Sequence, residues 1–237
     1  MPEVVFLPGF MQHADAWAPV AAAVGERYPS KAVDFATWTF EDRLAEIREA
    51  ASIGDVLVGY SMGGRLALHA ALRDPERYAG LALVGVSPGI EDAGEWRRRG
   101  RADEELAAWI ESHPIEEVVA RWEQNLVFES QSPALVEAQR PGRLAHSPAD
   151  LALLLRTAGQ GALAPAWDRL GELRTPVLAL AGDNDSTYWE AAQRMRASVE
   201  ARGGRIEAVG IPGAGHAAHL EQPEAVRDAL IEWLTRL

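Results

Sequence analysis

The stretch "LVGYSMGGRLAL", from Leu57 to Leu68, holds a serine between two glycines in the pattern Gly-x-Ser-x-Gly. An apolar run typical of a buried strand precedes Ser61, and the residues after it show the three- and four-residue apolar spacing of a helix. A serine at such a sharp strand-to-helix turn is a nucleophile elbow, where larger neighbours would collide with the strand and the helix. The pattern predicts a reactive serine, with a plain turn residue or a helix cap as the alternative.

Short apolar runs alternate along the chain with segments of helical periodicity. Because parallel strands need a helical crossover, this alternation predicts an α/β fold with a mostly parallel sheet of about six strands, flanked by helices on both faces. The expected strands are 3–8, 30–35, 55–60, 80–87, 175–182 and 205–212. The expected helices are 14–28, 39–52, 62–75, 188–204 and 222–237.

Residues 88–164 break the alternation, since they hold helical segments joined by Pro and Gly and no convincing buried strand. We interpret them as a helical cap, or lid, over the carboxyl-terminal edge of the sheet. The cap would be inserted into a core made of residues 1–87 and 165–237. Its clearest helical segments are 103–113, 115–128 and 148–158.

Composition narrows the class of protein. The formal charge of −12 argues against a nucleic-acid partner, because neutralising phosphates requires a basic surface. The absence of cysteine excludes a disulfide framework, a thiolate nucleophile and a Cys-ligated metal. No apolar run has the length of a membrane span or of a signal peptide, so we expect a cytoplasmic protein without a membrane partner. The motifs call for no cofactor and no metal, and they do not indicate an oligomeric state.

A serine hydroxyl is a weak nucleophile or base until a histidine takes its proton and a carboxylate holds that histidine. His216, in a Gly-rich loop after the last expected strand, is the natural base, although it could be an ordinary loop histidine. The carboxylate is expected just after strand 175–182, where Asp183 and Asp185 are both candidates. We favour Asp185, because about two residues are needed to reach back toward the histidine. His219, on the opening turn of a helix, is a weaker candidate for contact with a ligand.

A developing oxyanion needs two fixed hydrogen-bond donors. The backbone N–H of Met62, directly after the serine, is expected to be one of them. The second is expected in the loop "LPGF" after the first strand, where Gly9 would let the chain bend so that the Phe10 N–H points inward. A plain turn is the alternative for this loop.

These residues, in this order, resemble the α/β-hydrolase superfamily over nearly the whole chain. Within it, the segments "SPGIEDAGEWRRRGRADEELAAWI", "WEQNLVF", "RLAHSPADLALLLRTAGQG" and "GHAAHLEQP" are similar to the 2-succinyl-6-hydroxy-2,4-cyclohexadiene-1-carboxylate synthase family of menaquinone biosynthesis. The resemblance implies a lyase that eliminates pyruvate from a cyclohexene dicarboxylate bearing an enolpyruvyl group. In that reaction the activated serine is thought to act as a base, without a stable acyl-enzyme.

The resemblance also implies roles for individual residues. The triad would be Ser61, Asp185 and His216, and the backbone donors would be Phe10 and Met62. The residues implied to bind the anionic substrate are Arg65, Arg99, Arg143, Tyr60 and Trp122.

The spacing of Arg65 supports this reading, because positions i and i+4 share a helix face and Arg65 follows Ser61 by four residues. A guanidinium also binds a carboxylate with bidentate geometry. Arg97 or Arg98 could face inward in place of Arg99 within the run "RRRGR". Solvated helix arginines and core aromatic residues are the structural alternatives for these positions.

Two segments depart from the pattern of the resembled families. Pro8 stands where a histidine usually precedes the glycine of the first loop, and "VDFATWTFEDR", residues 33–43, lacks the Gly-rich turn common in the superfamily. A carboxylesterase-type serine hydrolase acting on a small anionic ester is therefore the second interpretation. A third, a catalytically silent binding protein, has no need of a complete Ser, Asp and His set.

Overall fold

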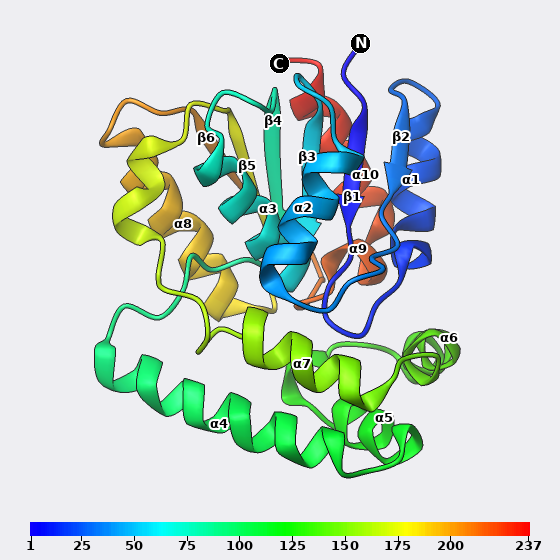
Figure 1. Ribbon diagram of the computed structural model, residues 1–237. Coiled ribbons are helices and arrows are strands. Elements are labelled where there is room, and N and C mark those ends of the chain that lie inside the picture. The colour runs from blue at the N-terminus through cyan, green and yellow to red at the C-terminus, as the bar shows by residue number, and fades with distance from the viewer.

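Six parallel strands form one sheet in the computed structural model, which describes residues 1–237 (Figure 1). Their order across the sheet is β2-β1-β3-β4-β5-β6, and each neighbouring pair is parallel. The strands are β1 (Val4–Leu7), β2 (Ser30–Ala32), β3 (Val56–Tyr60), β4 (Gly80–Val84), β5 (Val177–Gly182) and β6 (Ile206–Ile211). The predicted α/β fold and the position of every predicted strand are confirmed, although β2 is only half as long as the expected run.

Helices cover both faces of the sheet, and each face has its own apolar core. One core packs the sheet against α2 (Phe40–Ala50), α3 (Met62–Arg73), η3 (Trp167–Glu172) and α8 (Ser186–Glu200). The other packs it against η1 (Ala14–Trp17), α1 (Ala18–Gly25), α9 (Ala218–Glu221) and α10 (Pro223–Leu234). None of the helices combines the length and the hydropathy needed to span a bilayer.

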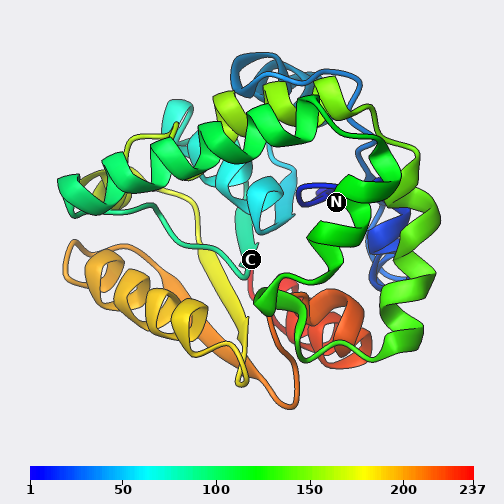
Figure 2. The same ribbon diagram turned by 90° about the horizontal axis from the view of Figure 1, so that it is seen from below.

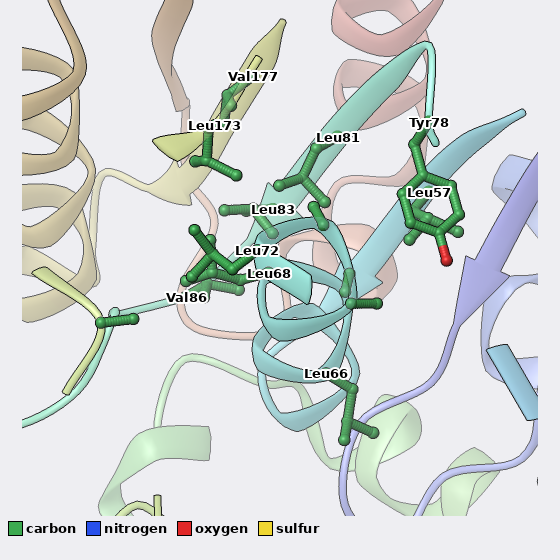
Figure 3. Close-up of a cluster of buried hydrophobic side chains, with 14 of the residues drawn as sticks. Leu57, Leu66, Leu68, Leu72, Tyr78, Leu81, Leu83, Val86, Leu173 and Val177 are labelled. Carbon is green, nitrogen blue, oxygen red and sulfur yellow. The ribbon is translucent and has the colours of Figure 1, made fainter. Parts of the chain in front are cut away.

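Helix α3 is central to the first core, because its leucines pack against the side chains of β3 and β4 (Figure 3). Leu66 and Leu68 are fully buried there, together with Leu57 and Leu81 of the strands. Each such side chain stabilises the fold by about 1.5 to 3 kcal/mol relative to exposure. The helix that follows Ser61 is therefore held rigidly against the sheet.

The segment between β4 and β5 is helical and lies beyond the carboxyl ends of the strands (Figures 1 and 2). It contains α4 (Ala93–Glu111), α5 (Ile115–Glu123), η2 (Leu126–Phe128), α6 (Pro133–Leu144) and α7 (Pro148–Ala158). Helices α4 and α7 run side by side, and they form a small apolar core with α5. The division of the chain into a core domain and a cap domain stays a prediction.

Two features of this segment differ from the sequence-based expectations. Helix α4 begins at Ala93, ten residues before the predicted start, because Asp92 caps its N-terminus and accepts a hydrogen bond from the Glu95 N–H. The arginine-rich first half of α4 is exposed and therefore lacks the apolar spacing that indicates a helix in a sequence. Helix α6 was not predicted, because Pro141 and Gly142 interrupt its sequence near the C-terminal end.

The strand order brings two loops together at the carboxyl edge of the sheet. Strand β1 lies between β2 and β3, so the chain winds outward from β1 in both directions. Leu7 at the end of β1 pairs with Gly59 of β3. Ligands of open α/β sheets bind at such a reversal of strand order, outside the carboxyl ends.

Candidate active site

Ser61 lies at the turn between β3 and α3 with an unusual backbone. Its φ of 48° and ψ of −110° lie in a region that residues other than glycine rarely adopt. A hydrogen bond of 2.9 Å from the Ser61 N–H to the Val84 carbonyl holds this conformation from the neighbouring strand. The turn lifts the hydroxyl away from both elements and toward the space beyond the sheet.

Three glycines allow the elements around Ser61 to approach closely. A Cβ on Gly59 would lie 2.5 Å from the Gly64 Cα, and a Cβ on Gly63 would lie 2.3 Å from the Pro8 carbonyl oxygen. Gly64, which lies outside the Gly-x-Ser-x-Gly pattern, would place a Cβ 2.3 Å from a methyl of Val86. No larger residue fits at any of the three positions without displacing backbone or core.

Ser61, His216 and Asp185 form a continuous hydrogen-bonded chain. The His216 Nε2 lies 3.1 Å from the Ser61 Oγ, and the His216 Nδ1 lies 2.9 Å from the Asp185 Oδ2. The Asp185 side chain is 12% exposed, and that of His216 is 5% exposed. Asp183 points elsewhere, because its carboxylate accepts a hydrogen bond from the Gly213 N–H at 2.8 Å.

His219 lies behind this chain and does not line the cavity beside Ser61. It is fully buried between the rings of Trp17 and Tyr60, at centroid distances of 4.4 and 4.3 Å. Neither ring nitrogen has a hydrogen-bond partner. Burial, followed by the proximity of His216, lowers the pKa of His219 to about 3, so the ring is neutral and packs as part of the core.

The Phe10 and Met62 N–H groups are both available at the end of the sheet. The Phe10 N–H donates no hydrogen bond within the chain. Met62 is the first residue of α3, where backbone N–H groups have no acceptor inside the helix. Both residues line the cavity that Ser61 faces.

The loop after β1 bends in a different way from the one expected. The left-handed residue is Met11, with φ of 56°, and not Gly9. Gly9 is needed for a close approach, since a Cβ there would lie 2.7 Å from the ring of Tyr60. The Gly9 N–H donates to the side chain of Gln12 at 3.0 Å, which fixes the loop beside Phe10.

A cavity of about 230 Å³ lies beside Ser61, lined by residues of the sheet edge and of the helical segment below it. Asp185 does not line this cavity, because it lies behind His216. The other nine predicted site residues line it: Phe10, Tyr60, Ser61, Met62, Arg65, Arg99, Trp122, Arg143 and His216.

Aromatic rings form one wall of the cavity. Trp122 contacts Phe10 edge to face at a centroid distance of 5.2 Å, and Phe128 at 5.6 Å. Tyr60 lies beside the His216 ring at 5.2 Å, and burial raises its pKa well above the ordinary value, so its hydroxyl stays protonated. These rings suit an apolar ring of a ligand, and the same cavity is also lined by arginines and side-chain amides.

Arg65 is a partly buried cation without a partner. Its guanidinium makes no ion pair or hydrogen bond with the protein, and its Nη1 is buried and unpaired. Burial lowers the pKa of Arg65 to about 10, which still leaves the group charged at neutral pH. An unpaired buried cation is costly, so this position favours an anionic ligand.

Arg99 is the arginine of its run that faces the cavity. Its Nε donates to the buried Asp103 carboxylate at 2.6 Å, and its Nη1 donates to Gln160 at 3.3 Å. Arg98 instead pairs with Glu95 at 3.6 Å on the surface, and Arg97 does not line the cavity.

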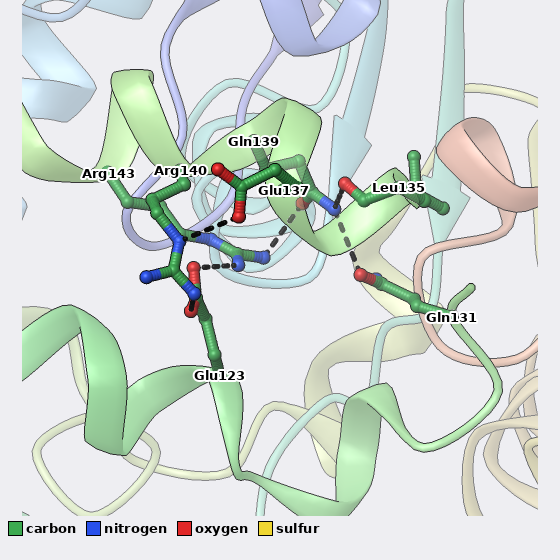
Figure 4. A network of polar contacts seen from close by, with 7 residues as sticks. All are labelled: Glu123, Gln131, Leu135, Glu137, Gln139, Arg140 and Arg143. Carbon is green, nitrogen blue, oxygen red and sulfur yellow. Dashed lines mark hydrogen bonds and ion pairs between the residues drawn. The ribbon is translucent and has the colours of Figure 1, made fainter. Parts of the chain in front are cut away.

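Arg143 is the most deeply buried of the three arginines, at 3% exposure. Figure 4 shows its side chain beside those of Glu123 and Gln139. Its guanidinium pairs with Glu123 at 3.2 Å and donates to Gln139 at 2.9 Å. Glu123 also pairs with Arg140, which pairs in turn with Glu137 at 3.2 Å, so the two arginines and the two glutamates of this cluster balance in charge. Burial lowers the pKa of Arg143, and the hydrogen bond that Arg143 donates to Glu123 opposes that effect.

A comparison of the whole chain with known families gives a direct result. The sequence model described as alpha/beta hydrolase family matches residues 4–229. The chain belongs to the alpha/beta hydrolase family.

Several relatives of this alpha/beta hydrolase share one name. A Bacillus subtilis (strain 168) protein, which carries the provisional name 2-succinyl-6-hydroxy-2,4-cyclohexadiene-1-carboxylate synthase, is 36% identical over 198 residues, or 82% of this chain and 71% of its own. The synthase of that name from Serratia proteamaculans (strain 568) is 27% identical, over 98% of this chain and 93% of its own. The solved structure of MenH from S. aureus superposes with a TM-score of 0.88, at 26% identity, over 99% of this chain and 94% of its own.

The fold is also shared with esterases. A thermophilic esterase from Thermogutta terrifontis superposes with a TM-score of 0.79 at 21% identity, over 100% of this chain and 90% of its own. That likeness shows the fold and nothing further. No group of three or more His, Cys, Asp or Glu side chains in this hydrolase is arranged to hold a metal ion.

Polar residues of the cavity were missed by the sequence reasoning. Tyr188 lies in the first turn of α8, with its ring 4.4 Å from that of His216, and its hydroxyl accepts a hydrogen bond from Gln160 at 3.1 Å. Gln139 and Asn125 also line the cavity. Only Tyr188 had a local signal, since it follows Asp185 by three residues. The amides are common surface residues, and their placement depends on how the helices pack.

Proposed function

We propose that this alpha/beta hydrolase is a 2-succinyl-6-hydroxy-2,4-cyclohexadiene-1-carboxylate synthase, which releases pyruvate from an enolpyruvyl-bearing cyclohexene dicarboxylate. The observation that carries the proposal is the unpaired Arg65 guanidinium in the same cavity as Ser61. An esterase for neutral substrates has no use for such a cation, whereas a substrate with several carboxylates does. The names of the relatives that span most of the chain support the same activity.

The triad would supply a strong base. His216 Nε2 takes the proton of the Ser61 hydroxyl, and Asp185 holds the imidazole in the required tautomer and stabilises its positive charge. The resulting serine alkoxide removes a proton from the ring carbon next to the succinyl carbonyl. The electron pair of that C–H bond moves into the conjugated system, and the C–O bond to the enolpyruvyl group breaks. The His216 imidazolium then protonates the departing enolate, which yields pyruvate and restores the triad.

The backbone donors would stabilise the charge that develops during proton removal. As the C–H bond breaks, negative charge collects on the oxygen of the neighbouring carbonyl. The N–H groups of Phe10 and Met62 are fixed donors for that oxygen, and a single donor of this kind is worth about 3 to 4 kcal/mol.

The three arginines would share the carboxylates of the substrate, although they are not equivalent. Asp103 offsets the charge of Arg99, and Glu123 lies between Arg140 and Arg143. Arg65 alone brings an uncompensated charge into the lining. We therefore assign Arg65 the largest electrostatic contribution, and Arg99 and Arg143 the fixing of orientation.

The test is pyruvate release from the enolpyruvyl precursor of the menaquinone pathway, with a short p-nitrophenyl ester assayed in parallel. The proposal predicts rapid release of pyruvate and slow cleavage of the ester. Ester cleavage without release of pyruvate would contradict it.

A carboxylesterase acting on a small anionic ester is the second candidate, because a serine 3.1 Å from the histidine base is equally suited to attack an ester carbonyl. Dependence on Arg65 separates a substrate with carboxylates from a neutral ester. The cytoplasmic location and the lack of a nucleic-acid partner stay predictions from the sequence.

A further inference from the structure

The loop that carries His216 is hydrogen-bonded to the carboxylate of Glu221. The Gly215 N–H donates to one oxygen of Glu221 at 2.8 Å, and the Ala217 N–H donates to the other at 3.0 Å. These are the two residues on either side of His216. Glu221 forms no ion pair with any arginine or lysine, so both of its oxygens serve the histidine loop.

The loop is confined on its other sides by close contacts. A Cβ on Gly182 at the end of β5 would lie 2.1 Å from the Ala214 carbonyl oxygen, and a Cβ on Gly215 would lie 1.9 Å from the Ser130 hydroxyl. Ser130 belongs to the helical segment beyond the sheet, so that segment presses on the histidine loop. Only a backbone trimmed to glycine fits between them.

Glycine permits these close contacts, but its own backbone can adopt more conformations than that of other residues. The contacts with Gly182 and Ser130 block movement of the loop toward β5 and toward the helical segment, but they do not fix its rotation. The two hydrogen bonds that the Gly215 and Ala217 N–H groups donate to the Glu221 carboxylate fix the peptide between Ala214 and Gly215 and the peptide between His216 and Ala217. Such bonds to an ionised acceptor are shorter and about twice as strong as neutral ones.

We propose that Glu221 is a positioning residue that sets His216 at hydrogen-bond distance from both Ser61 and Asp185. The proposal rests on the proposed function only in that the triad is taken as the reactive group. Glu221 does not line the cavity beside Ser61. Its loss should let the imidazole drift, and a displacement of about 1 Å in a reacting group can cost about 100-fold in rate.

The experiment compares Glu221→Gln with Glu224→Gln. The first variant keeps the shape of the side chain but leaves one oxygen to accept hydrogen bonds, and it turns an amide toward the second N–H. The second removes an equal charge three residues away, from an exposed side chain that has no hydrogen bond to the loop. Glu221→Asp, which is too short to span both N–H groups, is the further variant if Glu221→Gln does not fold.

Three readouts are used. The first is the rate at which a fluorophosphonate probe labels Ser61, which reports the activated serine whatever the natural substrate is. The second is the far-downfield proton NMR signal of the His216–Asp185 hydrogen bond. The third is the separation of kcat from KM for release of pyruvate.

We expect Glu221→Gln to lower the labelling rate and kcat by about 10- to 100-fold, to broaden the downfield signal and to leave KM within about 3-fold. Glu224→Gln should match the wild type in all three. A wild-type labelling rate in Glu221→Gln, or a loss that affects KM and kcat alike with the NMR signal intact, would overturn the proposal. Labelling of the wild type without release of pyruvate would instead count against the proposed substrate and leave the role of Glu221 standing.

Discussion

At the scale of single residues, two positions of the candidate active site lower the stability of this hydrolase. Ser61 holds a backbone conformation that glycine would adopt without strain. Arg65 keeps a partly buried charge that makes no ion pair or hydrogen bond within the protein. Strain and unpaired charge gather at functional sites because the same substitutions that would relieve them remove the chemistry.

The backbone strain at Ser61 can be measured through substitution. Ser61→Ala should abolish turnover and leave the fold intact, because it removes only the hydroxyl. Ser61→Gly should also abolish turnover, and it should raise the free energy of unfolding above that of Ser61→Ala by about 1 kcal/mol, since glycine accepts a φ of 48°. Urea unfolding of both variants provides the measurement. Full activity in Ser61→Ala would remove Ser61 from the triad.

Because the charge of Arg65 is unpaired, its removal should lower activity and raise stability. Arg65→Met should lower kcat/KM for the anionic substrate by about 10- to 150-fold, which corresponds to about 1.5 to 3 kcal/mol for one charge-assisted contact. It should also raise the melting temperature, because the thioether side chain is not penalised by burial. Arg97→Met, at a position outside the cavity, is the matched control for the lost charge. Equal losses of kcat/KM on the anionic substrate and on a neutral ester would show that Arg65 is structural.

At the scale of elements, the site depends on how closely α3 approaches the loop after β1. The carbonyls of Leu7 and Pro8 lie where a side chain on Gly63 would have to be. Backbone atoms cannot rotate away as a flexible side chain does. The distance between Ser61 and Phe10 is therefore set by a glycine and not by a hydrogen bond.

Two glycines in helices should respond to alanine in opposite ways. Gly63→Ala should destabilise the protein by about 1 to 3 kcal/mol, as overpacking does, and should impair the serine site. Gly142→Ala in α6 should be neutral or stabilising by up to about 1 kcal/mol, because its nearest neighbour, the His13 ring, would be 3.8 Å from the new Cβ. Chemical denaturation of the two variants measures both effects. The same sign of change in both would contradict this account.

At the scale of the whole molecule, one half-buried histidine, His69, and two buried ones, His146 and His219, make stability depend on pH. Burial is the main cause that lowers the pKa of His69 and of His146 to about 4 and that of His219 to about 3. They lie in α3, in the loop after α6 and in α9. Each ring is therefore neutral in the folded protein at a pH where the unfolded chain has begun to protonate it.

The sign of the pH effect follows from these values. The unfolded chain protonates histidine near pH 6.5, and the folded protein only near pH 4 or below. The stability that these histidines contribute is thus complete above about pH 6.5 and is lost as the pH falls toward 4. Urea unfolding from pH 7.5 to 4.5 should show this loss. His146→Gln should make the dependence shallower, and an unchanged slope would count against the buried neutral state of His146.

Local patterns in the sequence were enough for the six strands, for most of the helices and for their order along the chain. Each buried strand is a short apolar run, and the glycines around Ser61 mark a turn that larger residues cannot make. Alternation of strand and helix then leaves a covered parallel sheet as the architecture, because parallel strands require crossovers. The helical segments that were not predicted have irregular local sequences. Helix α6 contains Pro141, and the first half of α4 is an exposed run of charged residues.

Choices between near neighbours were left to the tertiary structure. The sequence favours Asp185 over Asp183 only by the reach of the loop, and the distance of 2.9 Å from Asp185 to His216, a residue 31 positions away, separates them. The choice of Arg99 over Arg97 and Arg98 depends on where α4 crosses the cavity. The sequence by itself determined which residue types are present and in what order, because strand, turn and helix patterns are local. Only the folded chain decided that Arg65 lacks a partner and that Glu221 holds the histidine loop, because both facts depend on atoms that many separate segments bring together.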